Sequence, residues 1–429
     1  MSWKTMKLGD ACTIEKGNIG IMKAIPGEYP LIVLGDERRS HNEYQFDDDA
    51  VIIPLVSSTG HGHRSMKRIH FQAGKFAVGN ILCAVIPKDK TVLSAQFLYR
   101  YLDLNREKEL VSRMRGMANV SLSVKSIADV EIPIPPIEIQ QEIIKRFDKV
   151  EKSNGELLSE HNYQLDFLKK LRQQILQDAV QGKIVPQDPN DEPASKLLER
   201  IKDEKEKLIQ EKKIKKDKPI PEIKPDEIPF EIPENWVWCR LGELASIVRG
   251  GSPRPAGDNR YYDGNIPFLK VADLTADDNI YLKNHTYTIK KEGLFKTRYV
   301  DAETLMLTNS GATLGVPKVC LFPTTFNDGI AALLGLNNIE KIFLYYFLKS
   351  KTEWYLKVAS RGQGQPNLNT DIISLTVFAL PPLNEQKRII TKLEQLVRLC
   401  DDLEQSIQQN QKYTQELLQV ALKEALEPT

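Results

Sequence analysis

The 429-residue sequence contains no run of about 18 or more apolar residues, which is the length a helix needs to span a bilayer. Its first residues, MSWKTMKLGD, lack the apolar core of a secretory signal peptide. The five cysteines are scattered, and no two of them have the CxxC spacing of a zinc or redox site. These absences predict a cytoplasmic protein with reduced thiols and with neither a membrane anchor nor a metal site.

Motifs of common enzymes are also missing. Both Pro-Pro pairs follow apolar residues, so neither completes the Asn/Asp-Pro-Pro-aromatic motif of adenine methyltransferases. No GxxxxGK[ST] phosphate loop is present. A nuclease-like Glu222-Ile223-Lys224 lies in a proline-rich segment without strand character, and the His61-Gly62-His63 pair lacks neighbouring metal ligands. The sequence therefore predicts a non-catalytic protein that uses no cofactor.

What the sequence does contain is an internal duplication. Residues 7–17 (KLGDACTIEKG) align with residues 240–250 (RLGELASIVRG) at an offset of 233. Residues 119–136 (NVSLSVKSIADVEIPIPP) align with residues 365–382 (QPNLNTDIISLTVFALPP) at an offset of 246. Two matching blocks in the same order indicate a repeated unit, and the larger second offset places net insertions in the middle of the second copy.

Each copy begins with short β-like runs that Gly, Asn, Asp and Pro separate, and it ends in a long segment that is nearly free of Gly and Pro. A Pro-Pro pair divides the two parts, because proline suits neither a central strand nor a helix interior. The predicted organisation is a first β-rich domain (1–136), a central long helix (137–186), a charged and proline-rich linker (187–232), a second β-rich domain (233–382) and a C-terminal long helix (383–429).

Both long segments carry apolar residues that alternate by four and three positions, the 3.5-residue period of a coiled coil. The predicted seam consists of Ile143, Phe147, Val150, Leu157, Leu168, Leu171 and Ile175 in the first helix, and Ile389, Leu393, Leu396, Leu403, Ile407 and Leu417 in the second. Five polar residues interrupt it: Asn154, His161, Gln164, Asn410 and Thr414. Two amphipathic helices that each pack on their own domain are the alternative, but they would need a broader apolar stripe. The duplication favours an antiparallel pair, and the fold class is α+β.

Residues 187–232 join the two copies. Residues 194–213 are rich in both charges and predict a solvent-exposed helix, and the proline-rich stretch that follows them predicts an extended spacer. A connector is the simpler interpretation, and a surface for another subunit is the alternative.

Several motifs of the second copy resemble the target-recognition domains of Type I restriction-modification specificity subunits. They are Arg249-Gly-Gly-Ser-Pro-Arg, Tyr261-Tyr262-Asp-Gly-Asn-Ile-Pro-Phe, Leu307-Thr-Asn-Ser-Gly-Ala-Thr-Leu-Gly, Phe326-Asn-Asp-Gly-Ile-Ala-Ala, and Gln365-Pro-Asn-Leu-Asn followed by Leu380-Pro-Pro-Leu-Asn-Glu-Gln. The linker, from Glu192-Pro-Ala-Ser to Pro233-Glu-Asn-Trp, is also similar to the central region of that family. The likeness extends over essentially the whole chain.

The resemblance implies that each β-rich domain binds one half of a bipartite, non-palindromic sequence in double-stranded DNA. It further implies that the paired helices set the gap between the half-sites and dock two methyltransferase (M) subunits, to which restriction/translocase (R) subunits are added. The complex, and not this chain, would hold the adenine-methyltransferase and ATP-dependent endonuclease activities. A helix of about 40 residues is roughly 60 Å long, which is one to two turns of B-DNA.

The formal net charge is +1, so a DNA surface must come from local groups of basic and polar residues. In the first domain these groups follow its opening strand, a Gly-rich basic loop, and the loop before the Pro-Pro pair. They comprise Lys16, Asn18, His61, His63, Arg64, Ser65, Lys67, Arg68, Arg113, Arg115, Asn119 and Ser121. Their counterparts in the second domain are Arg249, Ser252, Arg254, Arg260, Tyr261, Tyr262, Asn309, Ser310, Thr313, Lys318, Arg361, Gln363, Gln365 and Asn367. Lys and Arg suit phosphates and guanine, and Asn and Gln suit adenine edges.

Two other classes of function stay open from the sequence. A self-contained nuclease or methyltransferase would need an unrecognised active site. A structural coiled-coil adaptor would not require two large β-rich domains with basic, Gly-containing loops.

Overall fold

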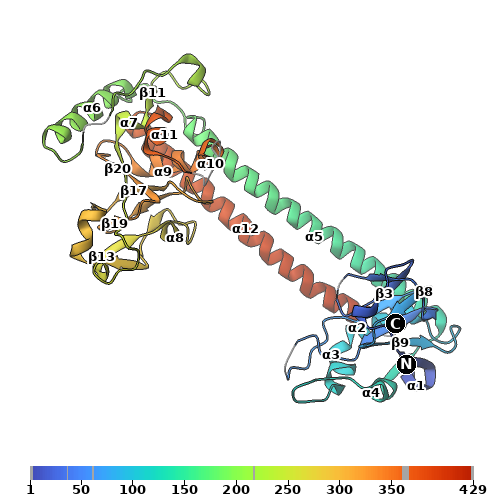
Figure 1. Cartoon of the computed structure of the whole chain (residues 1–429). Coiled ribbons are helices and arrows are strands. Elements are labelled where there is room, and N and C mark those ends of the chain that lie inside the picture. Colours follow the sequence, from blue (N-terminus) through green and yellow to red (C-terminus); the bar gives the residue numbers. More distant parts are fainter. Residues whose placement is uncertain (1–2, 36, 60–61, 216–217, 360–366, 427–429) are drawn as a thin grey trace. The chain divides into compact units, whose positions relative to one another are not determined.

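The computed structural model describes residues 3–35, 37–59, 62–215, 218–359 and 367–426. Contacts divide the chain into unit 1, residues 1–164 with 406–429, and unit 2, residues 165–405. Two long helices, α5 (Ile137–Val180) and α12 (Leu383–Ala425), each begin in one unit and end in the other (Figure 1). The compact units therefore divide each helix, whereas the sequence had predicted the helices as segments of their own.

In its described residues, unit 1 contains three antiparallel or mixed sheets and four short helices. One sheet has the order β2-β9-β6-β7 (Cys12–Lys16, Leu82–Pro87, Ala50–Pro54, His70–Gln72). Another has the order β4-β3-β8-β5 (Arg39–His41, Tyr29–Ile32, Lys75–Val78, Phe46–Asp47). A third pairs β1 (Lys4–Lys7) with β10 (Glu131–Ile134). The helices are α1 (Leu8–Ala11), α2 (Ala95–Leu104), α3 (Arg106–Glu109) and α4 (Val124–Ala128).

Unit 2 repeats this plan with additions. One sheet has the order β12-β20-β17-β18-β14 (Ser246–Arg249, Ile330–Leu334, Thr304–Thr308, Pro317–Cys320, Tyr281–Leu282). Another has the order β15-β13-β19-β16 (Tyr287–Ile289, Tyr262–Leu269, Thr324–Phe326, Arg298–Val300). A third pairs β11 (Val237–Arg240) with β21 (Val377–Leu380). The shorter helices are α6 (Ala194–Gln210), α7 (Leu241–Leu244), α8 (Val271–Leu274), α9 (Lys341–Ser350), α10 (Thr352–Ala359) and α11 (Thr370–Leu375).

The matching strand orders confirm the duplication, and two buried glutamines show how closely it holds. The Gln140 side chain donates to the carbonyl of Pro135 at 2.8 Å and accepts from the N–H of Ser94 at 2.9 Å. Gln386, 246 residues later, donates to the carbonyl of Pro381 and accepts from the N–H of Glu340, both at 3.0 Å. Each glutamine fixes the first turn of its long helix to the domain before it. Both are fully buried with these polar atoms paired, as buried amides require.

The core of each unit forms where apolar strands meet an amphipathic helix. In unit 1, every residue of β6 is buried, and α2 covers it with Phe97, Leu98 and Leu102. Ser94 caps α2 by accepting from the N–H of Phe97, which satisfies one of the free donors at a helix start. In unit 2, β17 and α9 take the corresponding places. The cores position the strand ends, from which the loops considered below extend.

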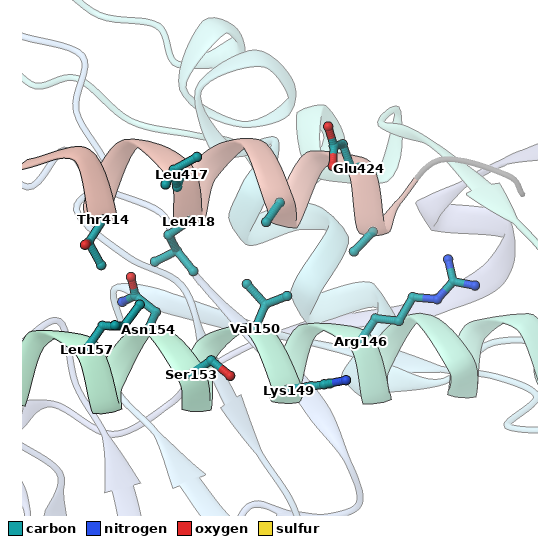
Figure 2. A pocket seen from close by; sticks show the side chains of 12 residues that line it. Arg146, Lys149, Val150, Ser153, Asn154, Leu157, Thr414, Leu417, Leu418 and Glu424 are labelled. Carbon is teal, nitrogen blue, oxygen red and sulfur yellow. The ribbon is translucent and has the colours of Figure 1, made fainter. Parts of the chain in front are cut away.

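Within each unit, segments of α5 and α12 lie side by side and antiparallel. Figure 2 shows the unit-1 segments of the two helices side by side. Phe147 packs in the same core as Leu422, and further along the Gln411 side chain donates to Asn162 at 3.1 Å. In unit 2, Arg172 pairs with Asp401 at 2.7 Å and with Glu404 at 2.9 Å. The numbering runs in opposite directions along the two helices in both units.

The predicted seam is wrong at Leu157, Leu171, Leu403 and Leu417, whose side chains are 50%, 37%, 53% and 66% exposed. In every case the next residue along the chain is less exposed: Leu158, Arg172, Glu404 and Leu418 are partly buried. Leu157-Leu158 and Leu417-Leu418 are adjacent leucines, between which a heptad count cannot choose. At the other two positions an interhelical ion pair takes the place of an apolar contact. Ile143, Phe147, Leu168, Ile389 and Leu393 are buried, whereas Val150, Ile175, Leu396 and Ile407 are partly buried.

The helix predicted in the linker forms as α6, but it is not a free solvent-exposed rod. Ala194, Leu197, Leu198 and Ile201 are buried on the core of unit 2. Most of its charged residues are exposed, but the partly buried Glu204 lies on the docked side and accepts from the Asn337 side chain at 2.6 Å. A sequence rich in alternating charges concealed this apolar stripe, which has the helical spacing of three and four residues.

All five cysteines are free thiols and buried. Burial raises the pKa of Cys83 to about 12 and that of Cys320 to about 11. None of the described helices combines the length and the apolar character that a membrane span needs. Among the described residues, no group of three or more His, Cys, Asp or Glu side chains could hold a metal ion; His61 lies outside them.

Candidate nucleic-acid interface

In unit 1, four separate segments are joined by backbone hydrogen bonds into one frame, which we define as residues 17–19, 55–57, 79–82 and 120–122. Gly17 N–H donates to the carbonyl of Leu82 at 2.9 Å, and Asn80 N–H donates to that of Ile19 at 2.9 Å. Leu55 N–H donates to the carbonyl of Ile81 at 2.9 Å. The frame closes where Ser57 N–H donates to the carbonyl of Val120 at 3.0 Å and Leu122 N–H to that of Leu55 at 2.9 Å.

Unit 2 contains the same frame, made of residues 250–251, 309–310, 326–330 and 367–368. Gly250 N–H donates to the carbonyl of Ile330 at 3.0 Å, and Asn309 N–H donates to that of Gly329 at 2.9 Å. Leu368 N–H donates to the carbonyl of Asn309 at 2.7 Å. Isolated β-bridges join Val56 to Ser121 in unit 1 and Ser310 to Asn367 in unit 2, so the two frames agree at each of these contacts.

The two frames bring together segments that the sequence analysis had selected separately. In each unit the opening segment, the loop after the central strand and the loop before the Pro-Pro pair meet at one place. The backbone of this place is repeated, whereas the side chains differ: Ser57 and Ser121 in one unit correspond to Gly311 and Asn367 in the other. One scaffold thus presents two different sets of hydrogen-bonding groups.

In unit 1, the basic loop leaves the frame and returns to it. Ser57 Oγ donates to the carbonyl of His63 at 2.6 Å, and Ser58 N–H donates to that of Ser65 at 2.8 Å. The other predicted residues of this unit that are exposed lie around the frame: Lys16, Asn18, Arg64, Lys67, Arg115, Asn119 and Ser121. Arg68 and Arg113 are partly buried, and Arg113 lies 3.8 Å from Glu109. Among these exposed residues, Lys16, Arg64, Lys67 and Arg115 are positively charged.

In unit 2, the opening segment is fixed by a residue that the sequence analysis missed. Asp328 accepts from Ser252 Oγ at 2.7 Å through its carboxylate and from Arg249 Nε at 2.6 Å through its carbonyl. It lies in the Phe326-Asn-Asp-Gly motif, and an acidic side chain gives no signal of a DNA contact because phosphates repel it. Asp328 positions Arg249 and Ser252, both of which belong to the predicted site.

Three predicted contacts in unit 2 are corrected by burial. Lys318 is 2% exposed, and its ammonium group donates to Asp277. Asn309 is fully buried, so its side chain does not face solvent where a base edge would lie. Tyr262 is buried, and its hydroxyl donates to the carbonyl of Pro253 at 2.8 Å. Burial of these residues could not be read from a turn-like or aromatic sequence.

The remaining predicted residues of unit 2 are either exposed to some degree or lie outside the described residues. Thr313, Arg254, Arg260 and Asn367 are exposed, and Ser310 and Tyr261 are partly exposed. Arg260 forms an ion pair at 2.7 Å with Asp258, and its hydrogen bonds lower the pKa of that carboxyl to about 2. Arg361, Gln363 and Gln365 lie outside the described residues.

Gly17 and Gly250 are needed for the close approach of backbones in the frames. A Cβ at Gly17 would lie 2.3 Å from the carbonyl oxygen of Gly79, and one at Gly250 would lie 2.2 Å from that of Asn327. Gly17→Ala and Gly250→Ala should each lower the free energy of unfolding by about 1–3 kcal/mol, because the backbones must separate. Gly35→Ala is the control, since nothing lies within 4 Å of its Cβ. Urea unfolding midpoints of the three variants test this, and equal midpoints would contradict it.

The family of the chain follows from a comparison with known proteins. Residues 1–166 and 233–412 match the model of the Type I restriction modification DNA specificity domain, one match for each copy. The chain belongs to this family. The likeness predicted from the motifs is thereby confirmed, and the duplication is the repeat of the specificity domain.

Individual relatives of this specificity-domain chain agree. It is 34% identical over 266 residues to the Type I restriction enzyme EcoAI specificity subunit of Escherichia coli, and the alignment covers 59% of the chain and 44% of that protein. It is 24% identical over 420 residues to the EcoDI specificity subunit of Escherichia coli, and this alignment covers 95% of the chain and 84% of that protein. The chain thus matches less than half the length of the EcoAI subunit.

A solved structure shows the same fold. The HsdS subunit of Thermoanaerobacter tengcongensis superposes with a TM-score of 0.57 at 16% sequence identity, covering 99% of this chain and 96% of that one. The two-unit α+β architecture with duplicated specificity domains is therefore shared with an HsdS subunit.

Proposed function

We propose that the chain is the DNA-reading subunit of a Type I restriction-modification complex, in which each unit binds one half of a bipartite, non-palindromic target. The pair of frames carries this proposal. A single backbone arrangement that occurs twice with different side chains suits two contacts with different base sequences. Identical units would instead suit a palindrome.

The long helices supply the second part of the proposal, an antiparallel coiled coil that sets the gap between the half-sites and docks two methyltransferase subunits. Exposed apolar side chains recur at the offset of the duplication: Leu157 and Leu403, Phe167 and Tyr413, Leu171 and Leu417. Each pair places one member in unit 1 and one in unit 2. Exposed apolar residues at repeated positions are suited to two copies of the same partner.

In unit 1, two of these side chains, Leu157 and Leu417, border a groove of about 570 Å³ between α5 and α12 (Figure 2). Val150, Leu157, Leu417 and Leu418 provide its apolar lining, and Arg146 and Lys149 lie at one side. The methyltransferase subunits bound here would supply the chemistry, and restriction subunits would join them. The chain itself would be a non-catalytic cytoplasmic protein without cofactors.

Co-expression with the modification subunit of the same system, followed by methylome sequencing of the host DNA, tests the proposal. The expected result is one split, non-palindromic motif that is methylated on both strands. Arg115→Gln in unit 1 and Asn367→Ala in unit 2 should alter or weaken opposite halves of that motif. A stable complex of the two proteins without new methylation would contradict the proposal and favour an adaptor.

A further inference from the structure

Unit 1 contains a cationic recess beside the basic loop, separate from the frame. It has a volume of about 470 Å³ and lies between residues 67–71, Arg38 and the helices α2 and α3. Arg38, Lys67, Arg68 and Arg106 contribute four fixed positive charges to its lining, and Asp103 contributes the one carboxylate among its described lining residues. Such an excess of charge around a small volume favours an anion.

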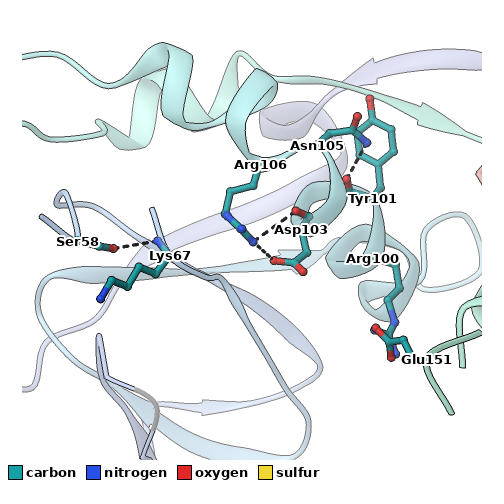
Figure 3. Close-up of polar contacts among 8 residues, drawn as sticks. All are labelled: Ser58, Lys67, Arg100, Tyr101, Asp103, Asn105, Arg106 and Glu151. Carbon is teal, nitrogen blue, oxygen red and sulfur yellow. Dashed lines mark hydrogen bonds and ion pairs between the residues drawn. The ribbon is translucent and has the colours of Figure 1, made fainter. Parts of the chain in front are cut away.

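The walls of the recess are held in place by the fold. Arg106 pairs with Asp103 from the adjoining helix, and Lys67 is anchored through its N–H to Ser58 Oγ at 3.0 Å (Figure 3). Arg38 donates to the carbonyl of Phe71 at 2.8 Å, on the edge strand β7. Tyr99 closes one side, and its ring packs against Phe71 at 6.1 Å between centroids. These contacts hold the Arg38 and Arg106 side chains and the backbone of Lys67 in place before any ligand arrives.

The duplication relates the unit-1 recess to a site around Lys318 in unit 2. His70 pairs with Ile52 on the neighbouring strand, and Lys318 pairs with Met306, the equivalent of Ile52. At the offset of 246 residues, Tyr99 corresponds to Tyr345 and Asp103 to Lys349. The unit-2 site therefore also combines cationic side chains with a tyrosine beside β18, the strand that corresponds to β7.

In unit 2 this site is filled by the chain's own carboxylate. Lys318 Nζ donates to Asp277 Oδ1 at 2.7 Å and to the Asp277 carbonyl at 2.9 Å. The hydrogen bond from Lys318 lowers the pKa of Asp277 to about 2, so that the carboxylate stays charged. The strand β14, which follows Asp277, pairs with β18. In unit 1, β7 is the outer strand, and no described strand covers it.

We propose that the unit-1 recess binds a phosphate oxyanion, namely a backbone phosphodiester of the DNA that lies across the neighbouring frame. The inference rests on the proposed function, because it assigns the phosphate to bound DNA. Lys67 connects the recess to the frame. Its backbone N–H donates to Ser58 Oγ, and the preceding residue, Ser57, belongs to the frame because its N–H donates to the carbonyl of Val120. A phosphate here would fix the register of the duplex on unit 1 without reading a base.

The double variant Arg38→Gln, Lys67→Gln in the complete complex with the modification subunit tests the recess. Both side chains are exposed, so the variant should fold. We expect its affinity for the methylated target duplex to fall by about tenfold. The slope of log affinity against log salt concentration should become less negative by about 0.9, the value for one lost phosphate contact. The methylated motif should not change.

A matched double variant, Lys4→Gln, Lys125→Gln, removes the same charge from exposed positions outside the recess and is the control. Equal affinities and salt slopes for the two double variants would overturn the inference while a methylated bipartite motif still supported the proposed function. If the unaltered complex methylates no such motif, the proposed function itself fails.

Titration of the chain with inorganic phosphate distinguishes a site for free phosphate from a site for DNA phosphate. If the recess variant loses phosphate binding but keeps its DNA affinity, the recess is a site for free phosphate and the DNA assignment is overturned.

Discussion

Replacing Arg240 by Gln is expected to lower the free energy of unfolding of unit 2 by about 3–5 kcal/mol. The Arg240 side chain is 4% exposed and makes four hydrogen bonds. It donates to the carbonyls of Pro221 at 2.8 Å, Glu222 at 3.0 Å and Leu375 at 2.6 Å, and to the Glu227 carboxylate at 2.8 Å. Glutamine cannot reach these acceptors together, so partly buried hydrogen bonds are lost.

The duplication supplies the control for this variant. Lys7 occupies the equivalent position in unit 1, where it forms an ion pair at 3.3 Å with Asp129, and both side chains are about half exposed. Lys7→Gln should therefore cost less than about 1 kcal/mol, as is usual for exposed ion pairs. Tryptophan fluorescence during denaturant unfolding reports unit 2, which contains Trp236, Trp238 and Trp354, whereas unit 1 contains Trp3. Similar losses for both variants would contradict the assigned role of Arg240.

Deleting one heptad from both long helices is expected to shorten the gap in the DNA target by about 3 base pairs. Removal of residues 158–164 and 409–415 takes out facing segments, which include the Asn162–Gln411 hydrogen bond, and preserves the repeat of the remaining seam. Seven helical residues span about 10 Å, and base pairs stack about 3.4 Å apart. Both half-sites should be unchanged, because the frames are unaltered. Methylome sequencing of the co-expressed system measures the gap directly.

Two further deletions serve as controls for the ruler. A heptad removed from α5 alone should abolish methylation, because the facing residues of α12 lose their partners. Removing three residues from each helix should do the same, because it rotates the seam away from the partner helix. A full-length gap after the matched heptad deletion would contradict the proposed ruler.

The sequence predicted the architecture through its repeats, and it failed where the choice depends on neighbouring chain segments. The offset between the copies predicted matched β-rich domains and two long helices, all of which form. The heptad pattern placed Leu157 and Leu417 in the seam, yet these two are exposed and the adjacent Leu158 and Leu418 are partly buried. An apolar residue at either of two adjacent positions satisfies the pattern, and only the packing of the partner helix decides between them.

The candidate site was predicted in the same uneven way. Gly-rich and polar loops were identified at both frames, because turn residues and basic groups stand out in a sequence. The hydrogen bonds that join these loops run between backbone groups up to several tens of residues apart, and they leave no mark on residue type. Asp328 and the recess around Arg106 depend on that assembly, as does the burial of Lys318. None of them could be predicted before the segments were brought together.

The frames also bear on how such a gene can change over generations. Their joining hydrogen bonds run from backbone N–H groups to backbone carbonyls, so apart from glycines such as Gly17 and Gly250 they make no demand on side-chain identity. Exposed surface residues usually tolerate substitution within about 0.5 kcal/mol. Under the proposed function, point mutations around one frame can therefore give new heritable target preferences in one unit while the other unit keeps its inherited half-site.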